Sequence, residues 1–383
     1  MANSSLTQAK SAKNDEFYTQ WADIEREVQA YLEFDPNIFR GKTILCPCDD
    51  PEWSNFTKFF ALHFHDYSLK KLISTSYAVE SKNYREGYQL TLFEQNDPKF
   101  DADKTRTQGK IFVLDSDDIN RDGVINIDDL KWDYLDSDGD FRSTEVLKLR
   151  DEADIIITNP PFSMFREFLA WIVEADKFFL IIGNMNATTY KEVFPLIMSN
   201  KMWLGNGFHA GNAYFSSPAL REYADGVYNP ESGLVKFRNC CWFTNIDHGR
   251  RHQPLPLMTM ADNLKFSKHK ELKGKTTYGR YDNYDAIEVP FTDAIPSDYD
   301  GVMGVPISFL DKYCPEQFNI VGTLESNAPD NAYRTYFYTS KECSEAYSTR
   351  FGKKGIYDLN ASGVVNGVKM FKRILIKAKG AAE

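Results

Sequence analysis

Short apolar runs and helical stripes alternate along the first half of the chain. Within residues 15–32 the apolar side chains Phe17, Trp21, Ile24, Val28 and Tyr31 recur every three or four positions, which predicts an amphipathic helix. Strands are expected around residues 44–45, 72–73 and 111–114, and a helix around residues 56–60. This alternation is typical of a parallel sheet in an α/β protein.

The clearest strand precedes residue 159. Residues 153–158 read Ala-Asp-Ile-Ile-Ile-Thr, and such a continuous apolar or β-branched run suits a central strand buried on both faces. A helical stripe follows at Phe165, Phe168, Leu169 and Ile172, and residues 178–182 form another apolar run. The turn after Thr158 therefore belongs at the carboxyl edge of the sheet, where open α/β sheets bind their ligands.

The periodicity weakens beyond residue 206. We predict a polar N-terminal segment at residues 1–13, an α/β core at 14–205 and an irregular C-terminal region at 206–383. The core is expected to hold a mostly parallel sheet with helices on both faces, interrupted by an acidic insertion at about residues 101–138. A strand-like segment at 240–244 falls in the C-terminal region.

Composition places the chain among folded proteins, with 42% hydrophobic and 14% aromatic residues. No early apolar stretch resembles a signal peptide, and no run approaches the ~20 apolar residues of a membrane span. The six cysteines show no zinc-site spacing and are expected to be reduced thiols. We therefore expect a cytoplasmic protein with no membrane contact.

The negative charge is concentrated in one segment. Residues 101–140 contain 12 Asp and 5 Lys or Arg, a net charge of −7 out of −10 for the whole chain. Basic clusters elsewhere suit contacts with phosphates, although solvated surface is the commoner role of such residues. The candidate DNA-binding residues are Arg250, Arg251, Lys372, Arg373 and Lys377.

The turn after the central strand reads Asn159-Pro160-Pro161-Phe162. The amino group of adenine is a poor nucleophile because its lone pair is delocalised into the ring. The side-chain oxygen of Asn159 and the carbonyl of Pro160 are suited to accept its two hydrogens, which favours a pyramidal, more reactive nitrogen. The prolines fix φ, and Phe162 offers a ring on which an extruded base can stack.

A proline turn that merely closes a strand is the simpler interpretation of Asn-Pro-Pro alone. The position of this tetrapeptide, between an apolar strand and an amphipathic helix, favours the catalytic interpretation.

Three segments are candidates for a cofactor pocket, because each combines a carboxylate with an aromatic ring or follows a strand. A carboxylate suits the amino group of an adenosine and a ring suits its face, although Asp-Gly-Asp is usually a turn and Phe17 also suits a core position. The candidate cofactor-binding residues are Phe17, Tyr18, Thr19, Cys48, Asp49, Asp50, Pro51, Asp140 and Phe141.

Taken together, these segments resemble the EcoRI-type family of adenine-specific DNA methyltransferases. The resemblance spans nearly the whole chain in the family's order. Its motifs are DEFYTQ at 15–20, CDDP at 48–51, SNF at 54–56, GDFRS at 139–143, TNPPFSMFREF at 158–168, FLIIGN at 179–184, TYKEVF at 189–194, YDNYDAI at 281–287, GVMGVPISFL at 301–310, PEQF at 315–318 and RILIK at 373–377.

The resemblance implies a Rossmann-like, S-adenosylmethionine-dependent methyltransferase fold with a C-terminal target-recognition region. It implies a monomer-competent enzyme that methylates a flipped adenine in double-stranded DNA and is often paired with a restriction endonuclease. It also implies that residues 159–162 form the catalytic motif, that residues 17–19 and 48–51 border the cofactor, and that Asp140 and Phe141 lie by its adenine.

Two features depart from methyltransferases in general. The first loop has no Gly-x-Gly, and the second strand, which ends in Ser74-Thr75-Ser76-Tyr77, lacks the acid expected to bind ribose hydroxyls. Asp49 or Asp50 is a candidate substitute.

The acidic insertion contains a pattern that matches a calcium loop of about 12 residues. Oxygen-bearing side chains occupy the expected positions and a glycine occupies the sixth, but the last position is Asp instead of Glu and no partner loop is evident. An acidic turn or DNA-mimicking loop is the alternative. The candidate calcium ligands are Asp118, Asn120, Asp122, Val124, Asn126 and Asp129.

Other functions remain open from the residues alone. Asn-Pro-Pro-aromatic suits any planar amide or amino group, so methylation of an RNA base or of a protein glutamine is one alternative. A non-catalytic DNA-binding relic is the other.

Overall fold

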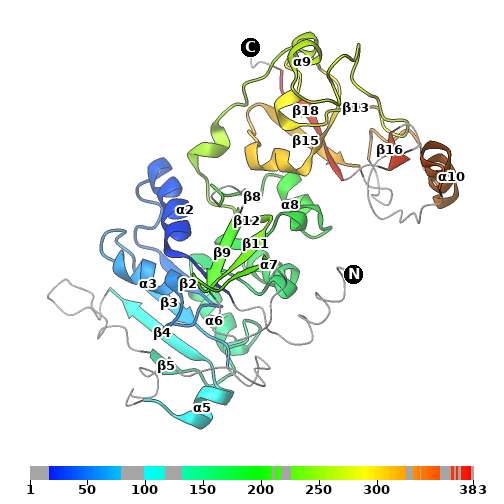
Figure 1. Ribbon diagram of the computed structural model, residues 1–383. Helices are drawn as coiled ribbons and strands as arrows, with labels where there is room; N and C mark the ends of the chain where they lie inside the picture. Colours follow the sequence, from blue (N-terminus) through cyan, green and yellow to red (C-terminus); the bar gives the residue numbers. More distant parts are fainter. Residues whose placement is uncertain are drawn as a thin grey trace. The chain divides into compact units, whose positions relative to one another are not determined.

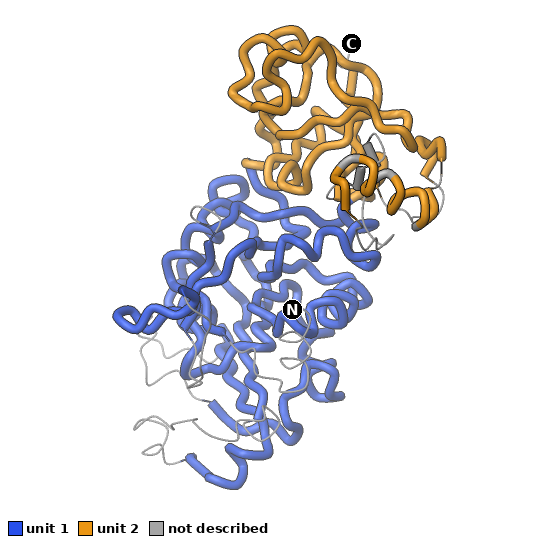
Figure 2. Tube along the Cα trace, turned by 45° about the vertical axis from the view of Figure 1, so that its right-hand side comes forward, with its two compact units in different colours: residues 1–197, 201–249 blue, residues 198–200, 250–383 orange. Residues whose placement is uncertain are grey.

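The computed structural model describes residues 17–78, 99–116, 132–208, 212–216, 226–324, 331–336, 338–353, 364–365, 368–369 and 372–380. The chain divides into two compact units (Figure 2). Unit 1 comprises Met1–Ile197 and Lys201–Gly249, and unit 2 comprises Met198–Asn200 and Arg250–Glu383.

Unit 1 is built on an eight-stranded sheet in the order β5-β4-β3-β2-β6-β7-β12-β8 (Figure 1). The four central strands are parallel: β3 (Lys71–Thr75), β2 (Thr43–Cys46), β6 (Ile155–Thr158) and β7 (Phe178–Asn184). The outer strands join by antiparallel pairing, which makes the sheet mixed: β4 (Lys110–Asp115), β5 (Trp132–Tyr134), β12 (Cys240–Thr244) and β8 (Trp203–Leu204).

Capped helices connect these strands. The side chains of Ser54, Asp101 and Ser143 accept hydrogen bonds from the first free N–H groups of α3, α5 and α6, which is the usual role of an N-cap. The helices among the described residues of unit 1 are α2 (Trp21–Phe34), α3 (Asn55–Leu62), α5 (Ala102–Thr107), α6 (Thr144–Glu152) and α7 (Phe165–Glu174), and α8 (Phe194–Met198) begins in this unit.

The first helix is shorter than its apolar stripe predicts. Helix α2 begins at Trp21, because Tyr18 and Thr19 form strand β1 instead. A hydrophobic stripe specifies a buried face but does not exclude an extended segment at its start, so Phe17 lies outside the helix.

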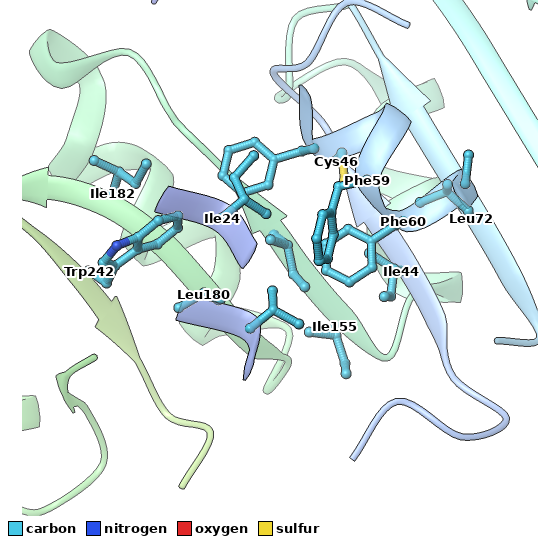
Figure 3. Close-up of a cluster of buried hydrophobic side chains, with 14 of the residues drawn as sticks. Ile24, Ile44, Cys46, Phe59, Phe60, Leu72, Ile155, Leu180, Ile182 and Trp242 are labelled. Carbon is cyan, nitrogen blue, oxygen red and sulfur yellow. The ribbon is translucent and has the colours of Figure 1, made fainter. Parts of the chain in front are cut away.

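A buried apolar cluster joins α2 and α3 to one face of the large sheet (Figure 3). Ile24 of α2 and Phe59 and Phe60 of α3 are at most 1% exposed, and they belong to the same cluster as Ile44 and Ile155 of the central strands. Burial of such side chains contributes roughly 1.5–3 kcal/mol each. This cluster therefore holds the two helices against β2 and β6, the strands that precede residues 47–51 and 159–162.

Unit 1 also contains a smaller antiparallel sheet in the order β1-β9-β11-β10. Its strands are β1 (Tyr18–Thr19), β9 (Asn212–Ser216), β11 (Leu234–Arg238) and β10 (Tyr228–Asn229). Residues 201–249 thus belong with the N-terminal unit, whereas the sequence pattern suggested a boundary at 205. The reason is long-range pairing: β12 joins the large sheet next to β7, and β9 pairs with β1.

Unit 2 centres on a four-stranded sheet in the order β13-β14-β18-β15. Its strands are β13 (Ile287–Glu288), β14 (Met303–Pro306), β18 (Arg373–Ala378) and β15 (Phe318–Thr323). A separate hairpin pairs β16 (Val364–Val365) with β17 (Val368–Lys369), and the helices are α9 (Met260–Phe266) and α10 (Ser340–Phe351).

The candidate calcium loop lies outside the described residues, as does the polar segment at 1–13. Among the residues that the structure describes, no helix is long and apolar enough to cross a membrane, and no group of three or more His, Cys, Asp or Glu has a metal-binding arrangement.

Candidate active site

The candidate site lies where β2 and β6 end. These parallel neighbours are paired through Ile44–Ile155 and Leu45–Ile156, so the loops that follow them leave from the same edge of the sheet. The chain runs outward from β2 to β3 on one side, and to β6 and β7 on the other. Such a change of direction is the usual ligand position in an open α/β sheet, and residues 47–51 and 159–162 meet there.

The side chain of Asn159 has a defined orientation at this edge. It is 8% exposed, and its Nδ2 donates a 2.6 Å hydrogen bond to the carbonyl oxygen of Phe17. A carbonyl only accepts hydrogen bonds, so the atom facing Phe17 must be the NH₂ group. The Oδ1 atom is then directed elsewhere, and it is buried without a hydrogen-bond partner among the described residues.

An unpartnered buried acceptor is unusual, because leaving one unsatisfied costs about 1–3 kcal/mol. The arrangement at Asn159 is therefore suited to a donor supplied by a ligand.

The two prolines and Phe162 follow in a tight conformation. Pro161 has φ of −53° and precedes a short 3-10 helix, Phe162–Met164. Phe162 is half-buried. Its ring centroid lies 6.5 Å from that of Phe17, with an angle of 22° between the ring planes. The centroids of Phe237 and Phe215 lie 5.5 and 6.2 Å away. Phe162 thus belongs to an aromatic cluster supplied by β9, β11 and the N-terminal segment, which the sequence pattern did not reveal.

Asp49 acts as a structural link between the two loops. It is 2% exposed, its Oδ2 accepts a 2.6 Å hydrogen bond from Thr158 Oγ1, and its Oδ1 accepts a 2.7 Å hydrogen bond from Ser54 Oγ. Both carboxylate oxygens are thereby engaged. Asp49 is therefore less suited to bind ribose hydroxyls than the sequence suggested, and its geometry instead ties the start of α3 to the end of β6.

The neighbouring residues of this loop differ from Asp49. Asp50 is 5% exposed and accepts the N–H of Glu52 through its Oδ1 at 2.9 Å, while Pro51 is buried and Cys48 is half-buried. The indole of Trp53 lies 6.5 Å from the Tyr18 ring at an angle of 15°. Trp53 Nε1 and Thr19 Oγ1 are buried without hydrogen-bond partners in the described part of the chain.

The loop at 139–141 packs tightly against the end of β3. Gly139 has φ of +80°, and a Cβ at this position or at Gly109 would overlap the carbonyl oxygen of Ser76, so this approach requires glycine. The carboxylate of Asp140 holds Arg142 through bonds of 2.6 and 2.8 Å, and this hydrogen bonding raises the pKa of Arg142.

Phe141 itself is a core residue in this structure. Its ring is 5% exposed and makes edge contacts with Phe168 at 5.1 Å and Trp171 at 5.7 Å. The glycine-dependent loop lies beside the end of β3, and the Phe141 ring turns toward α7.

The basic candidates of unit 2 fall into two groups. Arg251 is 7% exposed and donates to Asn200, and Arg373 forms an ion pair of 2.7 Å with Glu288 in which both side chains are about one-tenth exposed. These two guanidinium groups stabilise unit 2. Lys377 is exposed, Lys372 is half-buried, and Arg250 is one-third exposed and bound to Asp311 at 2.7 Å.

Residues that sequence reasoning passed over complete the site. Asn55 Nδ2 donates a 2.7 Å hydrogen bond to the carbonyl of Thr19, and the buried Lys110 pairs with Glu52 at 2.5 Å. Asn55 lies within the SNF motif of the family resemblance, so the sequence did mark this segment. Its hydrogen-bond partner is 36 residues away, and a local sequence pattern cannot predict such a partner.

Comparison with known proteins gives a consistent result. The family described as adenine-specific methyltransferase EcoRI matches residues 5–379. The Type II methyltransferase M.EcoRI of Escherichia coli is 41% identical over 342 residues, covering 88% of this chain and 95% of that protein. No solved structure matches the chain.

Two mycoplasma proteins are also similar. The Type II methyltransferase M.MpnI of Mycoplasma pneumoniae is 32% identical over 83% of this chain and 85% of its own length. The Type II methyltransferase M.MgeORF184P of Mycoplasma genitalium is 31% identical over 97% and 98% of the two chains. The similarity thus extends over both compact units.

Proposed function

Because this chain belongs to the EcoRI family of adenine-specific methyltransferases, we propose that it transfers the methyl group of S-adenosylmethionine to the 6-amino group of an adenine flipped out of duplex DNA. The observation that supports this most directly is the buried Oδ1 of Asn159, which has no hydrogen-bond partner in the part of the chain that the structure describes. An amino group is a donor that fits such an acceptor.

In this proposal Asn159 and Pro160 act on the nucleophile. The Oδ1 of Asn159 accepts one amino hydrogen and the carbonyl of Pro160 accepts the other, so the nitrogen becomes pyramidal and its lone pair is freed from the ring. Phe162 stacks on the extruded base. The protein's contribution to the rate is then positioning, without a covalent protein intermediate.

The cofactor supplies an electrophilic methyl group on a sulfonium ion. Strand β1 and the loop after β2 fit such a group, because Trp53 and Thr19 have buried polar atoms without partners in the described structure and the rings of Tyr18 and Trp53 lie nearly parallel. Residues 17–19, Cys48, Asp50 and Pro51 would border it, in a Rossmann-like arrangement of the parallel strands. Asp140 would lie near its adenine, with Asp49 holding the loop in place.

Duplex DNA is the proposed partner, and unit 2 the proposed target-reading part. Lys377, Lys372 and Arg250 are the more accessible basic candidates for phosphate contacts, whereas Arg251 and Arg373 would act by stabilising unit 2. We propose a monomeric enzyme, and the Type II names of the relatives suggest a cognate restriction endonuclease.

The test is a methyl-transfer assay with tritiated S-adenosylmethionine on duplex DNA, tRNA and a glutamine-containing peptide. We expect label only in DNA, and sequencing of modified bases in DNA from expressing cells should locate N6-methyladenine in one short sequence. Label in RNA or peptide but not DNA would reject the proposal.

A further inference from the structure

The catalytic motif and the loop after β2 belong to one closed ring of hydrogen bonds. Three short chain segments, 17–19, 54–55 and 158–159, are joined in this ring, with Asp49 as the remaining link. The bonds are Asn159 Nδ2 to Phe17 O at 2.6 Å, Asn55 Nδ2 to Thr19 O at 2.7 Å, Ser54 Oγ to Asp49 Oδ1 at 2.7 Å and Thr158 Oγ1 to Asp49 Oδ2 at 2.6 Å.

Strand β1 is the part of this ring whose position depends on side chains. It contains two residues, and it pairs on one edge with β9 through Tyr18–Ser216 and Thr19–Phe215. The amides of Asn159 and Asn55 hold the carbonyls of Phe17 and Thr19. Because Asn159 is oriented by the Phe17 carbonyl, whatever positions β1 also positions the catalytic amide.

Asn55 is well placed to do this. It is the first residue of α3, directly after Ser54, whose side chain accepts from the N–H groups of Phe56 and Thr57 and donates to Asp49. The helix start is therefore fixed to the large sheet. From there the half-buried Asn55 amide reaches β1.

We propose that Asn55 is a positioning residue for methyl transfer, which sets the orientation of the Asn159 amide by holding β1 through the Thr19 carbonyl. This inference rests on the proposed function of Asn159. Since a misplacement of about 1 Å in a reacting geometry can cost roughly 100-fold in rate, loss of the Asn55 bond should slow the chemical step without removing any group that touches a substrate.

The test compares two Asn→Asp variants in the full chain. Asn55→Asp replaces the donor facing the Thr19 carbonyl with an acceptor of the same size. Asn245→Asp is the matched control, because Asn245 is also half-buried and its Nδ2 donates to the carbonyl of Lys177 at 3.0 Å, at the opposite, amino-terminal edge of the sheet next to Phe178.

The measurements are the single-turnover rate of methyl transfer to plasmid DNA that contains the methylated sequence, the Kd for S-adenosylmethionine, the Kd for DNA and the Tm. For Asn55→Asp we expect the rate at saturating S-adenosylmethionine to fall about 10- to 100-fold. The Kd for DNA should stay within about twofold, and the Kd for S-adenosylmethionine, whose proposed position residues 17–19 border, should rise by less than the rate falls. For Asn245→Asp we expect the Tm to fall by about as much as in Asn55→Asp, while the rate of methyl transfer stays that of the unaltered chain.

Three results would overturn the inference: an unaltered rate in Asn55→Asp, equal slowing in Asn245→Asp, or a loss of cofactor affinity that accounts for the slower rate. Absence of DNA methylation by the unaltered chain is a different result. It would reject the proposed function, and this inference with it.

Discussion

Two largely buried polar clusters of this protein, one in each compact unit, differ in whether their hydrogen-bonding atoms all have partners. In unit 2, Glu288 binds Arg373 through both carboxylate oxygens and also accepts from the hydroxyl of Tyr281. In unit 1, the ring through Asn159 leaves the Oδ1 of that residue buried and without a partner in the described structure. A polar cluster in which every group has a partner stabilises one fold. A buried acceptor without a partner destabilises the protein, and a ligand that donates a hydrogen bond to it removes this destabilisation.

The comparison predicts that a substitution in the unit 2 cluster lowers the free energy of unfolding and leaves cofactor binding unchanged. Glu288→Ala leaves the guanidinium of Arg373, which is 12% exposed, without its carboxylate partner. Removing one member of a buried pair typically costs about 3–5 kcal/mol, and we expect a loss of this size in urea unfolding with an unchanged Kd for S-adenosylmethionine.

The control for this effect is Asp285→Ala, in the same unit. Asp285 pairs with Arg280 at 2.9 Å, but the side chains are 71% and 62% exposed. Exposed pairs contribute about 1 kcal/mol or less. Equal losses in the two variants would contradict the role assigned to burial.

The opposite signature is expected at the open acceptor. Asn159→Ala removes the group proposed to accept an amino hydrogen, so we expect methyl transfer to slow by about 100-fold or more, equivalent to roughly 2.7 kcal/mol in activation free energy. The Kd for S-adenosylmethionine, measured by calorimetry, should remain near that of the unaltered chain. A variant with near-normal methylation would count against the proposed mechanism.

The aromatic cluster beside Asn159 predicts a smaller effect. Stacking of a base on an aromatic ring is worth about 1–3 kcal/mol, so Phe162→Ala should weaken productive binding of the target adenine by about 5- to 150-fold. Phe237→Ala, which removes a ring 5.5 Å from Phe162, should have a lesser effect. Fluorescence of 2-aminopurine placed at the target adenine would report base extrusion. Equal signals from the unaltered chain, Phe162→Ala and Phe237→Ala would exclude the stacking role.

The smallest predicted effect is a pH dependence in unit 2. Burial, together with the nearby carboxylate of Glu288, raises the pKa of Tyr281 above its usual value. The neutral phenol is thus favoured in the folded state, and its contribution is fully present below the unfolded pKa of about 10. It is lost as the pH rises through the folded pKa.

Urea unfolding between pH 8 and pH 11 would measure this loss. Tyr281→Phe should reduce the loss of stability above about pH 10, at a cost of about 1 kcal/mol near neutral pH for the missing hydrogen bond. Part of the loss of stability at alkaline pH should remain in this variant, because burial and Glu27 also raise the pKa of Tyr31. An identical pH profile in the variant would exclude Tyr281 as a source.

Local sequence patterns were enough to predict much of the site. The apolar run at 155–157 and the stripe at Phe165–Ile172 predicted β6 and α7, because side-chain periodicity follows directly from burial on a strand or a helix. The chemistry of Asn159-Pro160-Pro161-Phe162 predicted a catalytic turn, which stays a prediction. The family resemblance was likewise readable from motifs alone and is confirmed by the comparisons.

Tertiary structure decided which atoms are available. Only the contact between Asn159 and Phe17, 142 residues apart, shows which end of the amide is left without a partner among the described residues. Only the bond between Asp49 and Thr158, 109 residues apart, shows that this carboxylate is already engaged. Long-range pairing likewise placed residues 206–249 in unit 1 and left the side chain of Arg373 only 12% exposed. A periodic pattern records whether a side chain is buried, but hydrogen-bond partners are chosen by the whole fold, and it is these partners that separate a structural polar group from a reactive one.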